Sequence, residues 1–185
     1  MKRVALWMIV LYGLAVVALP EGAGNAELTC ILQLNGVGPS VTTDPRTHLH
    51  LVLLSNRDGI DIYEDWNSWG YFARSFTASD SHSRRYEITR VPPDGWDRNF
   101  PSVVTLNRGQ FLITDIYLCD GTWRVSPRMS VPSGQELRVI GRFKQARDRL
   151  ALALGNPWVG NIKSAPIELS LSESCIARLN AGVKR

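Results

Sequence analysis

The stretch that decides the fold is VVTLNRGQFLITDIYLC, residues 103–119. Two apolar runs, 103–106 and 111–119, flank the turn signal NRG at 107–109, and this pattern predicts an antiparallel β-hairpin. The second run is apolar on both of its faces. One face holds Phe111, Ile113 and Tyr117, and the other holds Leu112, Ile116 and Leu118. We expect such a strand to lie at the centre of a sheet, covered from both sides.

On either side of this hairpin, residues 27–171 consist of further short segments that alternate at period two and are separated by turn signals. The alternating segments are 28–34, 49–53, two within 60–79, 86–91, 137–143 and 167–171. Seven to nine short strands with almost no helix predict an all-β protein, and specifically an immunoglobulin-like antiparallel β-sandwich. Two short helices are expected, one near 145–154 and one at the C-terminus, starting near Ser172.

The first 26 residues have the form of a signal peptide that is cleaved on export. Lys2 and Arg3 precede an apolar run at 4–19, and small residues occupy the expected cleavage site at Ala26. The run of 16 residues is shorter than the ~20 that a membrane-spanning helix needs. We therefore expect a signal peptide at 1–26, a sandwich at 27–171 and a tail at 172–185. The mature protein should be secreted or periplasmic and lack an integral membrane segment.

The three cysteines permit one disulfide and leave one thiol over. If successive strands alternate in direction, Cys119 ends its strand at the pole where Cys175 follows the last strand. Cys30 lies near the opposite pole, on the same face as Leu28 and Leu32. The prediction is a Cys119–Cys175 disulfide, formed in an oxidising compartment, with Cys30 as a buried thiol.

Four motifs occur in order along the chain: WG at 69–70, WDRNFP at 96–101, LNRG at 106–109 and WVGNIKS at 158–164. Together they resemble uncharacterised secreted bacterial proteins that are built on an immunoglobulin-like domain. The resemblance covers most of residues 45–171, although Arg108 stands where those proteins usually have a proline. It implies the immunoglobulin-like fold, and no activity accompanies it.

Tryptophans are the first candidates for a binding site, since exposed indole rings stack on the C–H faces of sugars. The candidates are Trp66, Trp69 and Trp96. On a regular strand Trp66 and Trp69 face opposite sides, unless a bend at residues 67–68 realigns them. The favoured explanation is that these aromatic residues fill the core and anchor loops.

Metal binding and catalysis have weaker sequence support. Asp58, Asp61 and Asp65 are candidate calcium ligands, although a solvated acidic loop is the favoured explanation and their spacing is not that of an EF-hand. His48, His50 and His82 are candidate zinc ligands, although surface histidines are the favoured explanation. No nucleophile elbow, HExxH motif or glycine-rich phosphate loop occurs, so no catalytic residue is assigned and no cofactor is expected.

The arginines are dispersed along the chain, which argues against a nucleic-acid partner. The favoured function is a secreted, non-catalytic binding or protein-interaction module, whose partner is an extracytoplasmic protein or a glycan. The alternatives are a carbohydrate-binding domain that uses exposed tryptophans, and a hydrolase in which carboxylates or a Ser/His pair converge in a cleft.

Overall fold

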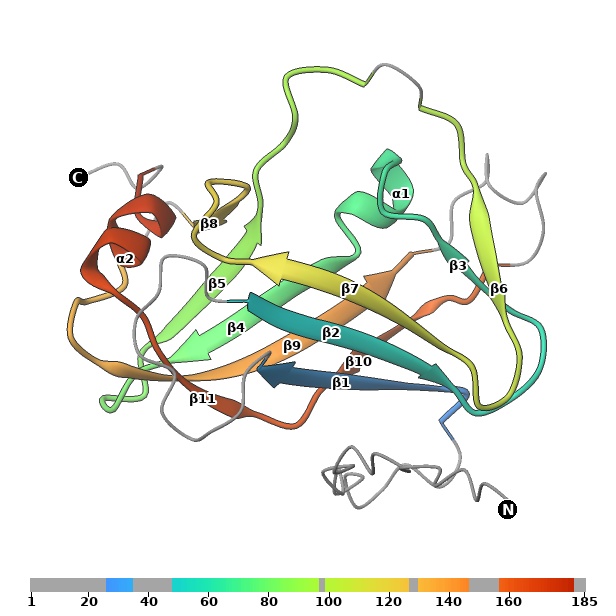
Figure 1. Cartoon of the computed structure of the whole chain (residues 1–185), viewed down its shortest axis with the longest axis horizontal. Helices are drawn as coiled ribbons and strands as arrows, with labels where there is room; N and C mark the ends of the chain where they lie inside the picture. The colour runs from blue at the N-terminus through green and yellow to red at the C-terminus, as the bar shows by residue number, and fades with distance from the viewer. Residues whose placement is uncertain (1–25, 35–47, 97–98, 127–129, 147–156, 182–185) are drawn as a thin grey trace, which may run out of the picture.

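A computed structural model describes residues 26–34, 48–96, 99–126, 130–146 and 157–181, and these form antiparallel sheets with two short helices (Figure 1). The predicted signal peptide lies outside the described residues except for Ala26. Within the described part, no helix is long and apolar enough to cross a membrane. Because the described residues form antiparallel sheets with only two short helices, the all-β class expected from the alternating segments is confirmed.

Two of the three sheets in the described structure face each other across the core, and the smaller of these two has three strands in the order β1-β2-β7. These are β1 (Leu28–Leu34), β2 (His48–Ser55) and β7 (Phe111–Tyr117). Their inward positions are filled by aliphatic side chains such as Leu32, Leu51 and Ile116, each at most 5% exposed. The period-two alternation of the sequence thus becomes one buried face.

The larger sheet has six strands, in the order β10-β9-β4-β5-β8, and β11 also pairs with β9. Its strands are β4 (Arg74–Ser79), β5 (Arg85–Arg90), β8 (Trp123–Val125), β9 (Glu136–Gln145), β10 (Gly160–Lys163) and β11 (Ile167–Ser170). The long strand β9 is central because β4 pairs with one of its edges, while β10 and β11 pair in succession along the other.

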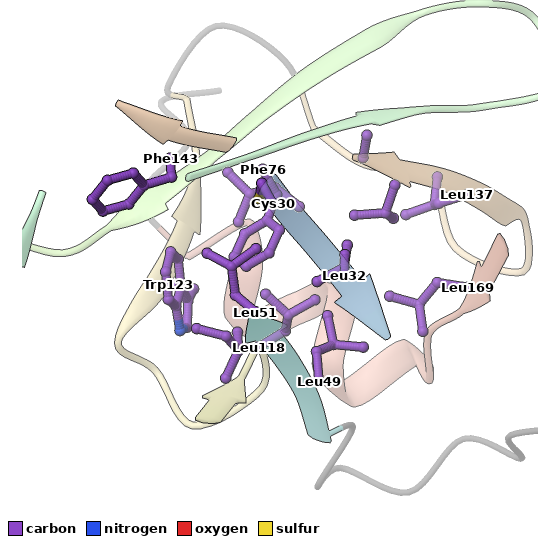
Figure 2. Packing of buried hydrophobic residues seen from close by; sticks show 14 of the residues in the cluster. Cys30, Leu32, Leu49, Leu51, Phe76, Leu118, Trp123, Leu137, Phe143 and Leu169 are labelled. Carbon is purple, nitrogen blue, oxygen red and sulfur yellow. The ribbon is translucent and has the colours of Figure 1, made fainter. Parts of the chain in front are cut away.

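Between the two sheets lies one hydrophobic core (Figure 2). It joins Leu49 and Leu51 of the smaller sheet to Phe76 and Phe143 of the larger one, and all four are fully buried. Cys30 projects into this core and carries a free thiol, as predicted. Burial raises the pKa of this thiol to about 12, so the side chain behaves as a small neutral hydrophobe.

The hairpin predicted at 103–119 is wrong in its pairing, although the turn is present. β6 (Val103–Leu106) pairs with β3 (Ile60–Tyr63) in a third, two-stranded sheet, whereas β7 pairs with β2. The chain bends at 55–59, between β2 and β3, and again at 107–110, between β6 and β7. At these bends Gly59 and Gly109 adopt positive φ angles of 69° and 79°. Each bend divides one extended segment of the chain into two strands. This is one reason why eleven strands are described instead of seven to nine.

The prediction that β7 is central and covered on both faces is also wrong. β7 is an edge strand of the smaller sheet, and its outer face is open. Phe111, Ile113 and Tyr117 on that face are 60%, 48% and 41% exposed. Apolar residues on both faces do not reveal whether another layer covers the strand, because coverage depends on distant segments.

Two short helices complete the described structure. α1 (Ser68–Tyr71) interrupts the two strands expected within 60–79, and α2 (Glu173–Leu179) is the predicted C-terminal helix. Ser172 caps α2, since its Oγ accepts a hydrogen bond from the backbone of Cys175 at 3.2 Å. A helix that begins at 145 is wrong because Gln145 is the last residue of β9, and 147–154 lie outside the described residues.

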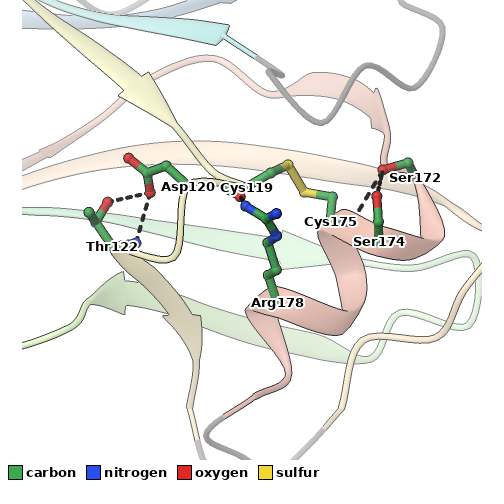
Figure 3. The surroundings of a disulfide bond; sticks show 7 residues. All are labelled: Cys119, Asp120, Thr122, Ser172, Ser174, Cys175 and Arg178. Carbon is green, nitrogen blue, oxygen red and sulfur yellow. Dashed lines mark hydrogen bonds between the residues drawn. A yellow bond between two sulfur atoms is a disulfide. The ribbon is translucent and has the colours of Figure 1, made fainter.

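A disulfide joins Cys119, just after β7, to Cys175 in α2, the pairing predicted from strand direction (Figure 3). The side chain of Arg178 adds a second tie, because Nη1 donates to the carbonyl of Cys119 at 2.8 Å. Ile176 and Leu179 are buried in the hydrophobic core. Helix α2 is therefore packed against the sheets. It lies within residues 172–185, the segment that the sequence led us to expect as a tail.

Candidate ligand-binding cavity

A cavity of about 320 Å³ opens beside the free edge of β7, where this strand diverges from β6. It is lined by Glu64, Asp65, Trp66, Arg74, Val104, Leu112, Ile113, Thr114 and Asp115. Its volume falls near the lower end of the range of about 300–1,000 Å³ that small-ligand sites occupy. Segments from four parts of the chain meet here, so the cavity is a product of the tertiary structure.

A buried arginine, Arg74, forms part of the cavity wall. Arg74 occupies the inward positions of β4 together with Phe76 and Ala78, and only 2% of it is exposed. Its Nε donates to Oγ1 of Thr114 at 2.9 Å, and its Nη1 donates to the carbonyl of Gly70 at 3.0 Å. Burial lowers the pKa of Arg74 to about 10, so the guanidinium remains charged at neutral pH.

The position of Arg74 depends on the tight geometry of α1. Asn67 is fully buried and caps the helix, since its Oδ1 accepts from the backbone of Trp69 at 3.1 Å and of Gly70 at 3.0 Å. A Cβ atom at Gly70 would lie 2.0 Å from the carbonyl oxygen of Glu64. Only glycine permits this approach, which turns the carbonyl of residue 70 toward Arg74 and leads the chain from Trp66 into β4.

Trp66 forms an aromatic wall of the cavity. It lies between β3 and α1 and is 42% exposed. Its indole packs edge-on against Phe100, with ring centroids 5.0 Å apart and ring planes at 72°. Phe100 itself is 54% exposed. An indole that is supported at one edge and open to solvent is suited to stack against an apolar ligand face.

Carboxylates occupy the rim of the cavity. Asp65 pairs with Nη2 of Arg90 at 3.3 Å, and Oδ1 of Asp115 lies 2.8 Å from Nδ1 of His50. The side chains of Asp65 and Asp115 are 42% and 55% exposed. Carboxylate oxygens accept hydrogen bonds, so this rim matches a ligand rich in hydroxyl groups.

The three predicted tryptophans do not form one surface. Trp66 lines the cavity, whereas Trp69 and Trp96 do not. Trp69 is half-buried with its ring centroid 6.5 Å from that of Tyr63. Trp96 packs edge-on against Tyr71 at 5.4 Å. The helical turn at α1 replaces the regular strand on which Trp66 and Trp69 were expected to face opposite sides.

The candidate calcium ligands are directed to separate partners. Asp58 accepts from the backbone of Arg108 at 2.9 Å, and Asp61 accepts from Oγ1 of Thr105 at 2.6 Å, while Asp65 pairs with Arg90. His50 contacts Asp115, and His82 lies in the β4–β5 turn. Across the described residues, no three His, Cys, Asp or Glu side chains are grouped to hold a metal.

A second cavity, of about 530 Å³, lies at the β4–β5 turn, and no aromatic residue lines it. There Asp80 is buried and holds the turn together. Its carboxylate accepts hydrogen bonds from Nε of Arg84 at 2.7 Å, from the hydroxyl of Tyr86 at 2.8 Å and from the backbone of His82 at 2.9 Å. Because Asp80 is fully used in this way, we assign it a structural role.

Sequence reasoning selected Trp66 as a sugar-binding residue and placed Asp65 in an acidic cluster with Glu64, but it did not select Arg74, Phe100 or Asp115 for any site. The sequence does contain a signal for Arg74. Arg74, Phe76 and Ala78 are spaced two residues apart, so all three side chains fall on the same, buried face of the strand. A charged side chain among core positions indicates either a buried ion pair or a site. Asp115 had no such signal, since its neighbours come from distant segments.

No protein-family model matches the chain, and no curated protein matches it. One similar solved structure is that of a Bordetella pertussis protein named "Putative ApaA Protein". The two share 11% sequence identity, with a TM-score of 0.36 over 79% of this chain and 94% of that one. A similarity at this level carries no conclusion about function.

Proposed function

We propose that this protein is an exported, non-catalytic binding module that takes a carbohydrate in the cavity beside Trp66. We further propose that its two packed sheets form an immunoglobulin-like β-sandwich of the kind found in the secreted bacterial proteins that its motifs resemble. The Cys119–Cys175 disulfide supports export, because such bonds persist in oxidising compartments.

The observation that carries the carbohydrate proposal is the combination of an exposed indole and hydrogen-bonding groups around one small cavity. Trp66 supplies a flat apolar surface for the C–H face of a sugar ring. Asp65, Asp115 and Glu64 supply acceptors for hydroxyl groups, and Arg74 supplies donors. A purely apolar ligand would displace water from these polar groups without replacing the hydrogen bonds that water makes, at a cost in affinity.

The test is calorimetric titration of the purified protein with soluble oligosaccharides of glucose, galactose, N-acetylglucosamine and galacturonic acid. We expect at least one series to bind, and Trp66→Ala to lower the affinity about tenfold or more, as loss of a buried aromatic contact implies. Phe72→Ala is the matched control, since Phe72 is 49% exposed near the same helix but does not line the cavity. Equal binding by wild type and Trp66→Ala would contradict the proposal.

The same titrations separate a binding module from a hydrolase. Glu64, Asp65 and Asp115 bring several carboxylates to one cavity, as glycoside hydrolysis requires. We expect each oligosaccharide to be recovered intact after incubation, as judged by mass spectrometry. Shortened products that disappear in Asp115→Asn would replace the binding proposal with a hydrolase.

Protein interaction is the second candidate function, and the open face of β7 favours it. Phe111 and Ile113 expose large apolar side chains on an edge strand, and such exposure commonly marks an interface. Under this alternative, a purified partner from the envelope of the producing cell binds the wild type but not Phe111→Lys, and Phe111 does not line the cavity. Thr105→Lys, at the one exposed position of β6, is the control that should retain the partner.

A further inference from the structure

The guanidinium of Arg74 is a buried charge with no carboxylate in direct contact within the described part of the chain. Arg74 is 2% exposed, yet it forms no ion pair with a described carboxylate. The nearby thiol of Cys30 is neutral, because burial raises its pKa to about 12. A buried charge is costly unless it is paired and hydrogen-bonded.

The hydrogen bonds that Arg74 makes to the protein use only some of the N–H donors of its guanidinium. A guanidinium has about five N–H donors, and the bonds to Thr114 and Gly70 use Nε and Nη1. Nη2 has no hydrogen-bond partner among the described residues. Packing against Phe143, whose ring centroid lies 5.7 Å from Cζ, holds the side chain in this orientation. The free donors belong to a residue that lines the cavity.

The charge of Asp65 acts on Arg74 from a distance and raises the pKa of Arg74, but neither Asp65 nor Asp115 forms an ion pair with it. Asp65 is held by Arg90 and Asp115 contacts His50, and both side chains are well exposed to solvent. Exposed charges interact through water and are screened by salt, whereas a charge in the low-dielectric interior acts strongly at short range. An anionic group that reaches Arg74 therefore gains more from it than it loses to the rim.

We propose that Arg74 binds the carboxylate of an acidic sugar, so that the ligand of the cavity contains a uronic acid residue. This inference rests on the carbohydrate function proposed above. The carboxylate would reach the buried guanidinium, the hydroxyl groups would donate to Asp65, Asp115 or Glu64, and one ring face would stack on Trp66. A guanidinium fork matches the planar geometry of a carboxylate.

The first test uses the unmodified protein and three probes of nearly equal shape: trigalacturonate, its fully methyl-esterified form and the neutral galactose trimer. We expect trigalacturonate to bind about tenfold more tightly or better, the difference that a charge-assisted hydrogen bond supplies. Equal affinities for all three would overturn the inference and leave the carbohydrate function intact. If none of these or the other oligosaccharides binds, both proposals fail.

A second measurement uses inorganic phosphate as a probe and Arg74→Lys as a variant. Phosphate that binds at millimolar concentration without competing against trigalacturonate leaves the inference standing, whereas phosphate that binds as tightly as the sugar overturns it.

Arg74→Lys keeps a charge but loses the planar fork of N–H donors, so the preference for trigalacturonate over its ester should shrink at least about fivefold. Arg142→Lys, which lies on β9 away from the cavity, should keep the preference. A thermal melt of each variant reports folding, and the comparison of probes on wild type stands even if Arg74→Lys unfolds.

Discussion

The side chain of Arg74 joins the two sheets, since its Nε donates to Oγ1 of Thr114 at 2.9 Å across the interior. Arg74 belongs to β4 of the larger sheet, and Thr114 belongs to β7 of the smaller sheet. Both residues are buried, with 2% and 7% of their surfaces exposed. The bond therefore contributes to sheet packing as well as to the geometry of the cavity.

Thr114→Val should destabilise the fold by about 1–3 kcal/mol. The substitution keeps the β-branched shape but removes the acceptor, which leaves a buried N–H of the guanidinium without a partner. Urea unfolding followed by tryptophan fluorescence measures the change. Thr89→Val, at an exposed position of β5, is the matched control and should change the free energy of unfolding by less than about 0.5 kcal/mol. Equal effects of the two variants would mean that the hydrogen bond adds nothing.

Gly70→Ala should destabilise the protein by about 1–3 kcal/mol and weaken ligand binding at the same time. The added Cβ would collide with the backbone of Glu64, and relief of that collision must shift α1, Trp66 or both. Gly95→Ala is the control, because nothing lies within 4 Å of a Cβ at that position. Chemical denaturation and oligosaccharide titration of both variants check the prediction. A Gly70→Ala protein that behaves like Gly95→Ala would show that the loop accommodates the methyl group freely.

Asp80 should make the fold sensitive to acid. Burial by itself raises the pKa of this carboxyl, but hydrogen bonds from Tyr86, Arg84 and the backbone of His82 outweigh burial and lower the pKa to about 2. The folded value thus lies below the ordinary value of 3.8, so the folded state binds fewer protons than the unfolded state in that interval. The stabilisation from Asp80 is complete above about pH 4 and is lost as the pH falls through about 2.

This pH dependence is measured by urea unfolding of wild type and Asp80→Asn from about pH 7 to about pH 2. We expect the wild type to be more stable at neutral pH, and the difference between the two proteins to shrink below about pH 4. Asp94→Asn, at an exposed position in a loop, serves as the control and should follow the wild type. A constant difference between wild type and Asp80→Asn across this range would show that Asp80 does not titrate as expected.

Reduction of the Cys119–Cys175 disulfide should lower the free energy of unfolding by about 2–5 kcal/mol, because the bond closes a long loop in the unfolded chain. Unfolding with and without reductant measures this effect. Thiol titration provides a separate check. The folded oxidised protein should react slowly, because Cys30 is buried, and the unfolded oxidised protein should show one thiol. Two or more thiols without reductant would mean that the disulfide does not form.

Much of the fold was determined by local sequence patterns. Period-two alternation located most of the strands, glycine and asparagine marked the turns, and the alternation of strand direction paired Cys119 with Cys175. Most of these inferences depend on neighbouring residues, because side-chain direction and turn geometry are set by the local backbone. Ser172 likewise indicated the start of α2 through its capping hydroxyl.

The tertiary structure alone decided which strands pair and which faces stay open. The turn at 107–110 has the sequence of a hairpin, yet β6 pairs with β3 and β7 pairs with β2. The chain bends at this turn, whereas the local pattern predicts that it reverses direction there. The exposure of Ile113 and the burial of Arg74 depend on which distant segments cover each strand. The cavity has the same origin: Trp66, Arg74 and Asp115 come from separate segments of the chain, and only the packing of two sheets and α1 brings them together.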